Sequence, residues 1–152
     1  MEKSKICLSE IKELIPHREP FLYIEELNNI EKLNRATGIN TFKDEDSFFA
    51  GHFPGHPVVP GVILVEMMAQ TAAALIAYSI RDETFDKIVY LMNIDSSKFR
   101  KPVFPNEKIK ANVIAMRSKG RVWRFEGNSF NEKEELVCSS KWSAMIMDRN
   151  NE

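Results

Sequence analysis

Cysteine is scarce in this sequence. Cys7 and Cys138 are its two cysteines, and they lie far apart along the chain. Such a pair lacks the spacing of a disulfide framework or of a CxxC metal motif, so we expect reduced thiols. Residues 1–15 also lack the continuous apolar core of a secretory signal, because charged residues interrupt them. Both absences predict a cytoplasmic protein.

The sequence has no internal repeat, low-complexity stretch or domain linker. A chain of 152 residues, 43% of them hydrophobic, is long enough for one domain with its own core and too short for two domains of ordinary size. We therefore expect a single domain that spans residues 1–152.

No excess of one charge marks the whole chain, whose net charge is −1. The charges are uneven all the same, because nine basic residues and one acidic residue, Glu107, lie in the segment from Lys98 to Arg124. This basic segment is either a solvated face without a partner or a docking surface for a polyanion or an acidic carrier protein.

The spacing of apolar residues predicts one short helix and several strands. Ser9 is positioned to cap a helix that Pro16 ends. Segments that alternate apolar and polar residues, or that are rich in β-branched and aromatic residues, are typical of strands. These segments cover residues 21–27, 35–42, 87–94, 97–104, 108–116, 121–130 and 136–147. Together with one long helix, six or seven strands predict an antiparallel sheet in an α+β fold.

The long helix is predicted from residues 58–80, which are nearly all apolar. The run is long enough to span a bilayer, but a charged Glu66 near its middle would cost about 3 kcal/mol there. Pro60 marks the expected start, because the first helical residue needs no backbone N–H. We therefore expect a buried central helix wrapped by the sheet, and no membrane span.

Glu66 and Gln70 are the strongly polar residues of this helix, and their spacing of four places them on one face. Burial disfavours a charged carboxylate and raises its pKa, so Glu66 is a candidate proton donor. The alternative interpretation is structural: Glu66 pairs with a cation, or Gln70 hydrogen-bonds it and the pair keeps a dimer interface in register.

His52 and His56 lie upstream of the helix, in the proline- and glycine-rich loop HFPGHPVVPG. A loop of this composition presents side chains to solvent or ligands. The prolines and the glycine between the two histidines prevent the helical turn that would direct both rings at one ion, and beyond His17 the chain has no other histidine, so we expect no metal site. We interpret His56 as structural and His52 as a candidate base.

The loop leads into the helix at Gly61 and Val62, whose N–H groups are free donors backed by the helix dipole. Such donors suit a developing oxyanion. An imidazole base, an oxyanion site and a neutral carboxylic acid together suit proton abstraction next to a carbonyl, with a second proton delivered to a leaving hydroxyl.

The segment HFPGHPVVPGVILVEMMAQ resembles the signature of the bacterial 3-hydroxyacyl-[acyl carrier protein] dehydratases of the FabZ type. The resemblance continues in LIPHREPFLYIEEL before this segment and in IDSSKFRKPVFP, WRFEGNSF and AMI after it, in the order of that family. The resemblance implies a hot-dog fold and a homodimer with joined sheets, often assembled as a trimer of dimers. It also implies dehydration of (3R)-3-hydroxyacyl-[acyl carrier protein] to the trans-2-enoyl form in fatty acid biosynthesis. It implies no cofactor of the enzyme's own, because the phosphopantetheine belongs to the carrier protein, and no nucleic acid.

Carried over by position, the resemblance makes His52 the base and Glu66 the acid that reaches the same site from the neighbouring subunit. Gly61, with Val62 beside it, would hold the thioester oxygen, and Gln70 would position Glu66 or a water. The acidic carrier protein would dock on the basic segment, for which the candidates are Lys98, Arg100, Lys101, Arg117, Lys119 and Arg121. Residues that either line the acyl channel or belong to the core are Phe21, Phe53 and Met68.

Three residues depart from the family pattern: Glu19 replaces an aromatic residue, Met67 an alanine, and Asn106 the glycine of a PGD turn. We expect the bulk of Met67 to affect chain-length preference. Glu66 in place of aspartate resembles the branch that dehydrates without isomerising. Two rival functions are a hot-dog thioesterase and a subunit that binds the acyl carrier without catalysis, and the presence of both His52 and Glu66 argues against each.

Overall fold

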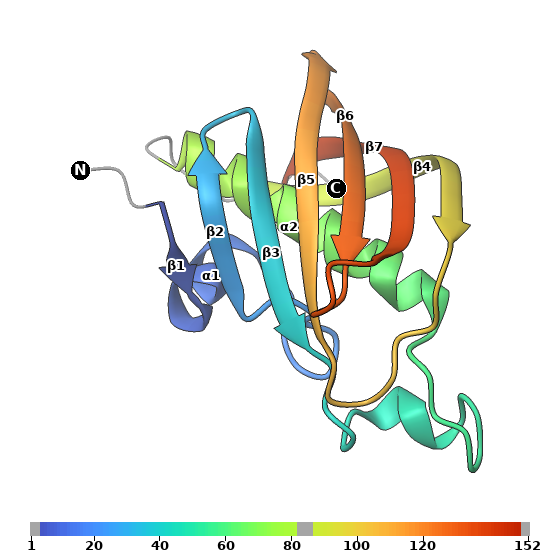
Figure 1. The fold of residues 1–152 in the computed structure, drawn as a ribbon. Coiled ribbons are helices and arrows are strands. Elements are labelled where there is room, and N and C mark those ends of the chain that lie inside the picture. The colour runs from blue at the N-terminus through green and yellow to red at the C-terminus, as the bar shows by residue number, and fades with distance from the viewer. Residues whose placement is uncertain (1–3, 82–86, 150–152) are drawn as a thin grey trace.

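The computed structural model describes residues 4–81 and 87–149. In this part of the chain, seven antiparallel strands form one sheet in the order β1-β2-β3-β5-β6-β7-β4, and the sheet curves around a long helix, α2 (Figure 1). The strands are β1 (Ile6–Cys7), β2 (Glu26–Glu31), β3 (Arg35–Thr41), β4 (Lys87–Phe99), β5 (Lys108–Lys119), β6 (Val122–Phe130) and β7 (Leu136–Asp148). The helices are α1 (Leu8–Leu14), the 3₁₀ helix η1 (Ser47–Ala50) and α2 (Gly61–Ile80). The predicted α+β architecture is confirmed.

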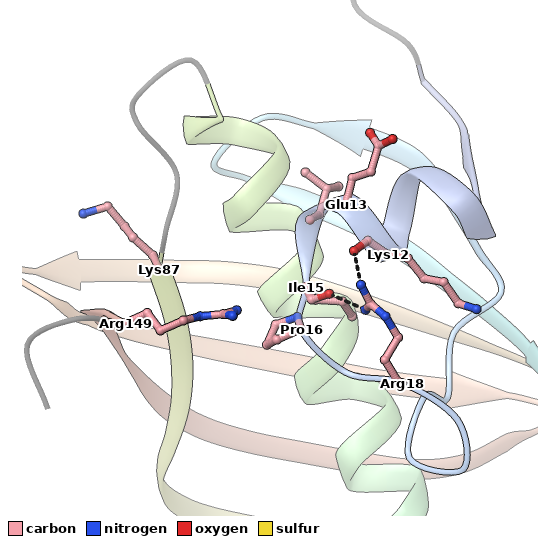
Figure 2. A pocket seen from close by; sticks show the side chains of 8 residues that line it. Lys12, Glu13, Ile15, Pro16, Arg18, Lys87 and Arg149 are labelled. Carbon is pink, nitrogen blue, oxygen red and sulfur yellow. Dashed lines mark hydrogen bonds between the residues drawn. The ribbon is translucent and has the colours of Figure 1, made fainter.

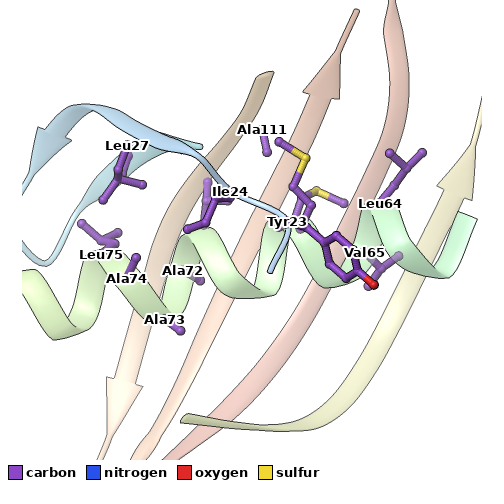
Figure 3. Packing of buried hydrophobic residues seen from close by; sticks show 14 of the residues in the cluster. Tyr23, Ile24, Leu27, Leu64, Val65, Ala72, Ala73, Ala74, Leu75 and Ala111 are labelled. Atoms are coloured by element: carbon purple, nitrogen blue, oxygen red, sulfur yellow. The ribbon is translucent and has the colours of Figure 1, made fainter. Parts of the chain in front are cut away.

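Helix α2 forms the centre of the hydrophobic core. It begins at Gly61, one residue after the predicted start, because Pro60 is its N-cap, and 13 of its 20 residues are buried. Its length and composition alone would allow it to cross a membrane, but 72% of its most apolar window is buried inside the fold. Figure 3 shows how Ile24 and Leu27 pack with Ala72 and Leu75 of the helix. The sheet therefore covers the apolar surface that a bilayer would otherwise cover.

Two glycines allow the sheet to approach α2 closely. A Cβ atom at Gly38 of β3 would lie 2.1 Å from Oγ1 of Thr71, and one at Gly127 of β6 would lie 2.6 Å from Sδ of Met68. Strand glycines are typical of places where another backbone comes near. These two contacts fix how deeply the helix sits in the curve of the sheet.

The strand pattern was predicted best where alternation is clear. In β5, Ile109, Ala111 and Val113 are buried while the residues between them are exposed, which is the period of two expected for a strand with one face on the core. β3, β6 and β7 also coincide with predicted segments to within one or two residues.

Three expectations about secondary structure were wrong. Helix α1 is capped by Cys7 and not by Ser9, because the backbone N–H and thiol of Cys7 both bond the carboxylate of Glu10. Most of 21–27 is not strand, since the N–H of Tyr23 and the carbonyl of Phe21 bond a side chain of α2 and β2 starts only at residue 26. The segments 87–94 and 97–104 are not two strands, because pairing with β7 continues through two irregularities and ends at residue 99.

Strand β4 is an edge of the sheet. Among the described residues it pairs with β7 alone, so its other side has free backbone groups over a length of 13 residues. Its large apolar side chains are exposed: Tyr90, Leu91, Met92, Ile94 and Phe99. A long, apolar, unpaired edge of this kind is a surface suited to pairing with another strand.

Candidate active site

The ring of His52 is held in one tautomer by its own loop. Nδ1 of His52 lies 2.9 Å from the carbonyl oxygen of Val58, and the N–H of Val58 donates to the carbonyl of His52 over the same distance. A carbonyl oxygen only accepts, so Nδ1 must carry the proton of this bond. In the neutral ring Nε2 is therefore unprotonated, which is the state that a general base requires.

The rest of the loop is a tight turn. The N–H of Phe53 bonds the carbonyl of His56, and the N–H of His56 bonds the carbonyl of Phe53. Gly55 between them has a φ of 74°, which glycine adopts without strain. The ring of Phe53 stacks on that of His52 at 4.1 Å, whereas the exposed His56 contacts the edge of Phe104. The turn therefore supports His52, while the structural role of His56 stays a prediction.

Gly61 and Val62 begin α2 and border an open cavity of about 400 Å³. Their N–H groups have no acceptor within the helix, because the first turn of any helix lacks one. Phe99 of β4 packs directly on Gly61, where a Cβ atom would lie only 2.8 Å from its ring. The basic side chains of Arg100 and Lys101 line the same cavity.

Glu66 and Gln70 form the predicted pair on one face of α2. Nε2 of Gln70 donates to Oε1 of Glu66 at 3.0 Å and to the carbonyl of Phe21 at 3.2 Å, and Oε1 of Gln70 accepts the N–H of Tyr23 at 2.8 Å. Burial raises the pKa of Glu66, although the bond from Gln70 works in the opposite direction. Glu66 is thus a carboxyl group whose surroundings favour the protonated form.

His17 is a neighbour of Glu66 that the sequence did not predict. Its Nε2 lies 3.7 Å from Oε1 of Glu66, and the two side chains are 22% and 21% exposed. Arg18 fixes the backbone here, since its guanidinium donates to the carbonyls of Lys12, Ile15 and His17. Figure 2 shows the bonds to Lys12 and Ile15, beside a cavity of about 220 Å³. The signal in the sequence was the rigid PHREP segment, which places an imidazole directly after α1.

A small cavity of about 110 Å³ lies beside Glu66. It is bounded by Glu66, Gln70 and alanines of α2, by His17, by β7 and by Val89, Tyr90 and Leu91 of the edge strand β4. His52 does not line this cavity. In a single chain, therefore, His52 and Glu66 do not line the same cavity of the described residues. Both the cavity and the start of α2 lie against β4.

Metal binding has no support in the described ranges 4–81 and 87–149. No group of three or more histidine, cysteine, aspartate or glutamate side chains there could hold an ion. Cys7 and Cys138 are both free thiols, the first exposed and the second buried.

Comparison with known proteins connects this site to one family. The sequence profile of the FabA-like domain matches residues 15–140. A 3-hydroxyacyl-[acyl-carrier-protein] dehydratase FabZ of Rhodospirillum rubrum is 39% identical over 96% of this chain and 91% of its own, and one of Gluconobacter oxydans is 42% identical over 93% and 83%. The chain belongs to the FabZ dehydratase family.

Solved structures support the fold of this FabZ family member. A chain of the dehydratase heterocomplex ApeI:P from Xenorhabdus doucetiae superposes with a TM-score of 0.78 at 14% identity, over 91% of both chains. A hypothetical protein of Thermus thermophilus, described as a thioesterase superfamily member, gives 0.62 at 12% identity over 87% and 88%. At these identities the likeness concerns the fold alone, and it confirms the predicted hot-dog arrangement.

The candidate docking residues of this FabZ-type chain fall into two groups. Arg100 and Lys101 follow the end of β4 and line the cavity at Gly61, and Lys101 pairs with Glu135, whereas Lys98 of β4 lines a different cavity with Ser139 and Lys141. The other three are exposed around the β5–β6 turn: Arg117, Lys119 and Arg121. Pairing aligns that turn with residue 145 of β7 but Lys98 with residue 139, a separation of about 20 Å along the strands. A small partner surface would therefore contact one group more readily than both at once, and the first group is the one beside Gly61.

Among the candidate channel residues, Met68 is fully buried and belongs to the core. Phe21 and Phe53 are 50% and 52% exposed, so the core interpretation is wrong for these two in the isolated chain.

The departures from the FabZ pattern are accommodated locally. Glu19 pairs with Lys12 at 2.8 Å, and Asn106 has a φ of 69°, a conformation that asparagine tolerates better than most residues. Met67 is fully buried in the core, and it is not among the residues that line the cavity beside Glu66.

Proposed function

We propose that this protein removes water from (3R)-3-hydroxyacyl-[acyl carrier protein] and forms the trans-2-enoyl product in fatty acid biosynthesis. The observation that carries the proposal is the pair of candidate catalytic groups. Burial of Glu66 raises its pKa and favours its protonated form, and the bond from Nδ1 of His52 to a carbonyl leaves Nε2 of that ring unprotonated. Membership of the FabZ family supplies the substrate class, since the relatives are named for it.

In the proposed mechanism, Nε2 of His52 removes a proton from C2 of the thioester. The electron pair of the broken C–H bond forms the C2–C3 double bond as the C3–O bond breaks. Glu66 transfers its proton to the departing hydroxyl, which leaves as water. The N–H groups of Gly61 and Val62 stabilise the negative charge on the thioester oxygen, and no cofactor takes part.

The proposed unit is a homodimer joined through the β4 edges. Pairing of the two edges would bury the exposed apolar side chains of β4 and satisfy its free backbone groups. Because the cavity beside Glu66 and the start of α2 both border β4, the same pairing would close each site with residues of the other subunit. We propose that His52 of one subunit works with Glu66 of the other, and that three dimers associate in the cytoplasm.

The carrier protein is proposed to dock beside Gly61. Arg100 and Lys101 line the cavity at this helix terminus and are exposed, so an acidic partner could bind them while its phosphopantetheine enters the cavity. Arg100 and Lys101 are therefore the favoured docking residues, and Lys98, which lines a different cavity, would add charge to one side of them.

Mixed dimers test the proposed site. Glu66→Gln and His52→Ala should each lower turnover of the homodimer by about 10² to 10⁴-fold, while circular dichroism shows an unchanged fold. Co-refolding of the two inactive variants creates dimers in which one site has both native residues and the other has neither. These mixed dimers should regain about half the activity of a wild-type dimer. Recovery would not occur if both residues served a site within one chain, and the intersubunit site would then be rejected.

Assays of the wild-type protein distinguish dehydration from the two rival functions, thioester hydrolysis and carrier binding without catalysis. Formation of the enoyl thioester is followed by absorbance, and thioesterase activity is followed by release of free thiol. A thiol signal without enoyl product would favour the thioesterase. Tight binding of the acyl carrier without either product would favour a non-catalytic subunit.

A further inference from the structure

The orientation of the Gln70 amide is fixed by a backbone donor. The N–H of Tyr23 can only donate, so the atom of Gln70 that faces it must be the carbonyl oxygen. The NH₂ group therefore faces Oε1 of Glu66 and the carbonyl of Phe21. Oε1 of Glu66 is thus an acceptor, whatever the protonation state of the carboxyl group.

The protonation of His17 follows from its buried nitrogen. Nδ1 of His17 is inaccessible to solvent and has no hydrogen-bond partner in the described part of the chain. A buried N–H without a partner is costly, so the stable ring is neutral with Nδ1 bare and the proton on Nε2. Burial, with the nearby charge of Arg18, lowers the pKa of His17 and favours the same neutral form. The proton is then on Nε2, the ring nitrogen that lies 3.7 Å from Oε1 of Glu66.

We propose that His17 is a positioning residue which, together with Gln70, keeps Oε1 of Glu66 as an acceptor and so leaves the acidic proton on Oε2. The inference rests on the proposed function, in which Glu66 is the proton donor. Gln70 already donates to Oε1, and a second donation from His17 would leave Oε2 as the oxygen that delivers the proton; no described residue hydrogen-bonds Oε2.

The geometry needs only a small adjustment for this role. At 3.7 Å the atoms Nε2 of His17 and Oε1 of Glu66 are about 0.6 Å beyond an ordinary hydrogen bond. The three bonds from Arg18 to backbone carbonyls limit how far the His17 segment can drift. The other ionisable side chains near the pair are Tyr90 in the cavity wall and Tyr23, whose pKa is raised by burial and by the charge of Glu66.

Two amide variants test the donor itself. In His17→Gln the side-chain NH₂ can reach the place of Nε2, whereas the shorter side chain in His17→Asn cannot. Infrared difference spectra over pH, with the Glu66→Gln protein subtracted, report the carboxyl stretch of Glu66 and its pKa without any substrate. In His17→Asn the stretch should move to higher frequency, because Oε1 accepts one bond fewer. The pKa should rise by about one unit, since a donor to the carboxylate has been lost.

Turnover supplies the second readout. His17→Asn should lower kcat about tenfold with little change in KM, and the alkaline limb of its pH profile should move upward with the pKa of Glu66. His17→Gln should retain the wild-type spectrum and most of kcat. The inference is overturned if both variants match the wild-type spectrum and rate, or if both lose activity with the Glu66 band unchanged. An inactive wild-type enzyme would instead reject the proposed function, while the spectra would still report on His17.

Discussion

Replacing Gln70 by glutamate keeps the size of a buried side chain but removes its donor. Gln70 is 1% exposed and its NH₂ group donates to Oε1 of Glu66 and to the carbonyl of Phe21. In Gln70→Glu, an ionised carboxylate would face both acceptors at once. We therefore expect the introduced carboxyl to remain protonated in the folded protein, with a pKa well above its value in the unfolded chain.

The cost of this substitution follows from the hydrogen bonds. When the introduced carboxyl is protonated, its O–H restores one of the two donations, so at about pH 5 the free energy of unfolding should fall by only about 1 kcal/mol. At about pH 8 the folded protein must either keep a proton that the unfolded chain has released, or ionise and lose both donations beside two acceptors, so the loss should exceed about 3 kcal/mol. The sign follows from linkage, because above the unfolded pKa the folded state binds a proton that the unfolded state has released.

Urea unfolding of wild type and variant at both pH values measures the effect. The raised pKa of Glu66 also weakens stability as pH rises, and loss of the Gln70 donor raises it further in any Gln70 variant, so the comparison that isolates the introduced carboxyl is between two Gln70 variants. Gln70→Met is the matched control, because it loses the same donors without adding a titratable group. Its loss should grow from pH 5 to pH 8 only through the rise of the Glu66 pKa, and so by less than the loss of Gln70→Glu. An equal loss for Gln70→Glu at pH 5 and pH 8 would refute the assigned direction of the amide.

Two further predictions concern the packing of α2 and the free edge. Gly38→Ala should lower the free energy of unfolding by about 1–3 kcal/mol, because its Cβ would lie 2.1 Å from Thr71; Gly51→Ala, with open space around it, should change it by less than about 0.5 kcal/mol in the same urea titration. Ile94→Lys places a charge on the exposed β4 edge and should turn dimers into folded monomers with at least tenfold lower activity, measured by light scattering and enoyl formation; an active monomer would contradict the shared site.

The sequence predicted those parts of the fold that local pattern determines. The start of α2 follows from Pro60 to within one residue and the alternation of β5 from residues two apart, so neither depends on distant contacts. The length of β4 could not be predicted in this way, because β7 extends it by pairing past two irregularities. The lack of strand at Tyr23 has a similar cause, since its N–H is taken by a side chain 47 residues away.

The candidate site shows the same division between local and distant information. Glu66 and Gln70 were paired correctly because a spacing of four aligns them on any helix. His17 was missed because its approach to Glu66 depends on how the segment after α1 folds onto α2, which no local period encodes. The tautomer of His52 was likewise unpredictable, since it depends on a carbonyl across an irregular turn.

Two residues belong both to the free edge of β4 and to the cavity beside Glu66, the proposed acid. Tyr90 and Leu91 are exposed apolar side chains of β4, and both also line the cavity beside Glu66. Edge pairing that removes them from water would also remove water from the cavity, and the pKa of Glu66, already raised by burial, would rise further. Dimer formation would then have two effects on the site. It would bring His52 of the other subunit close to Glu66, and it would keep the proton on Glu66. A chain kept monomeric by a charged edge should accordingly have a lower Glu66 pKa than the wild-type dimer, in the same infrared titration used for His17.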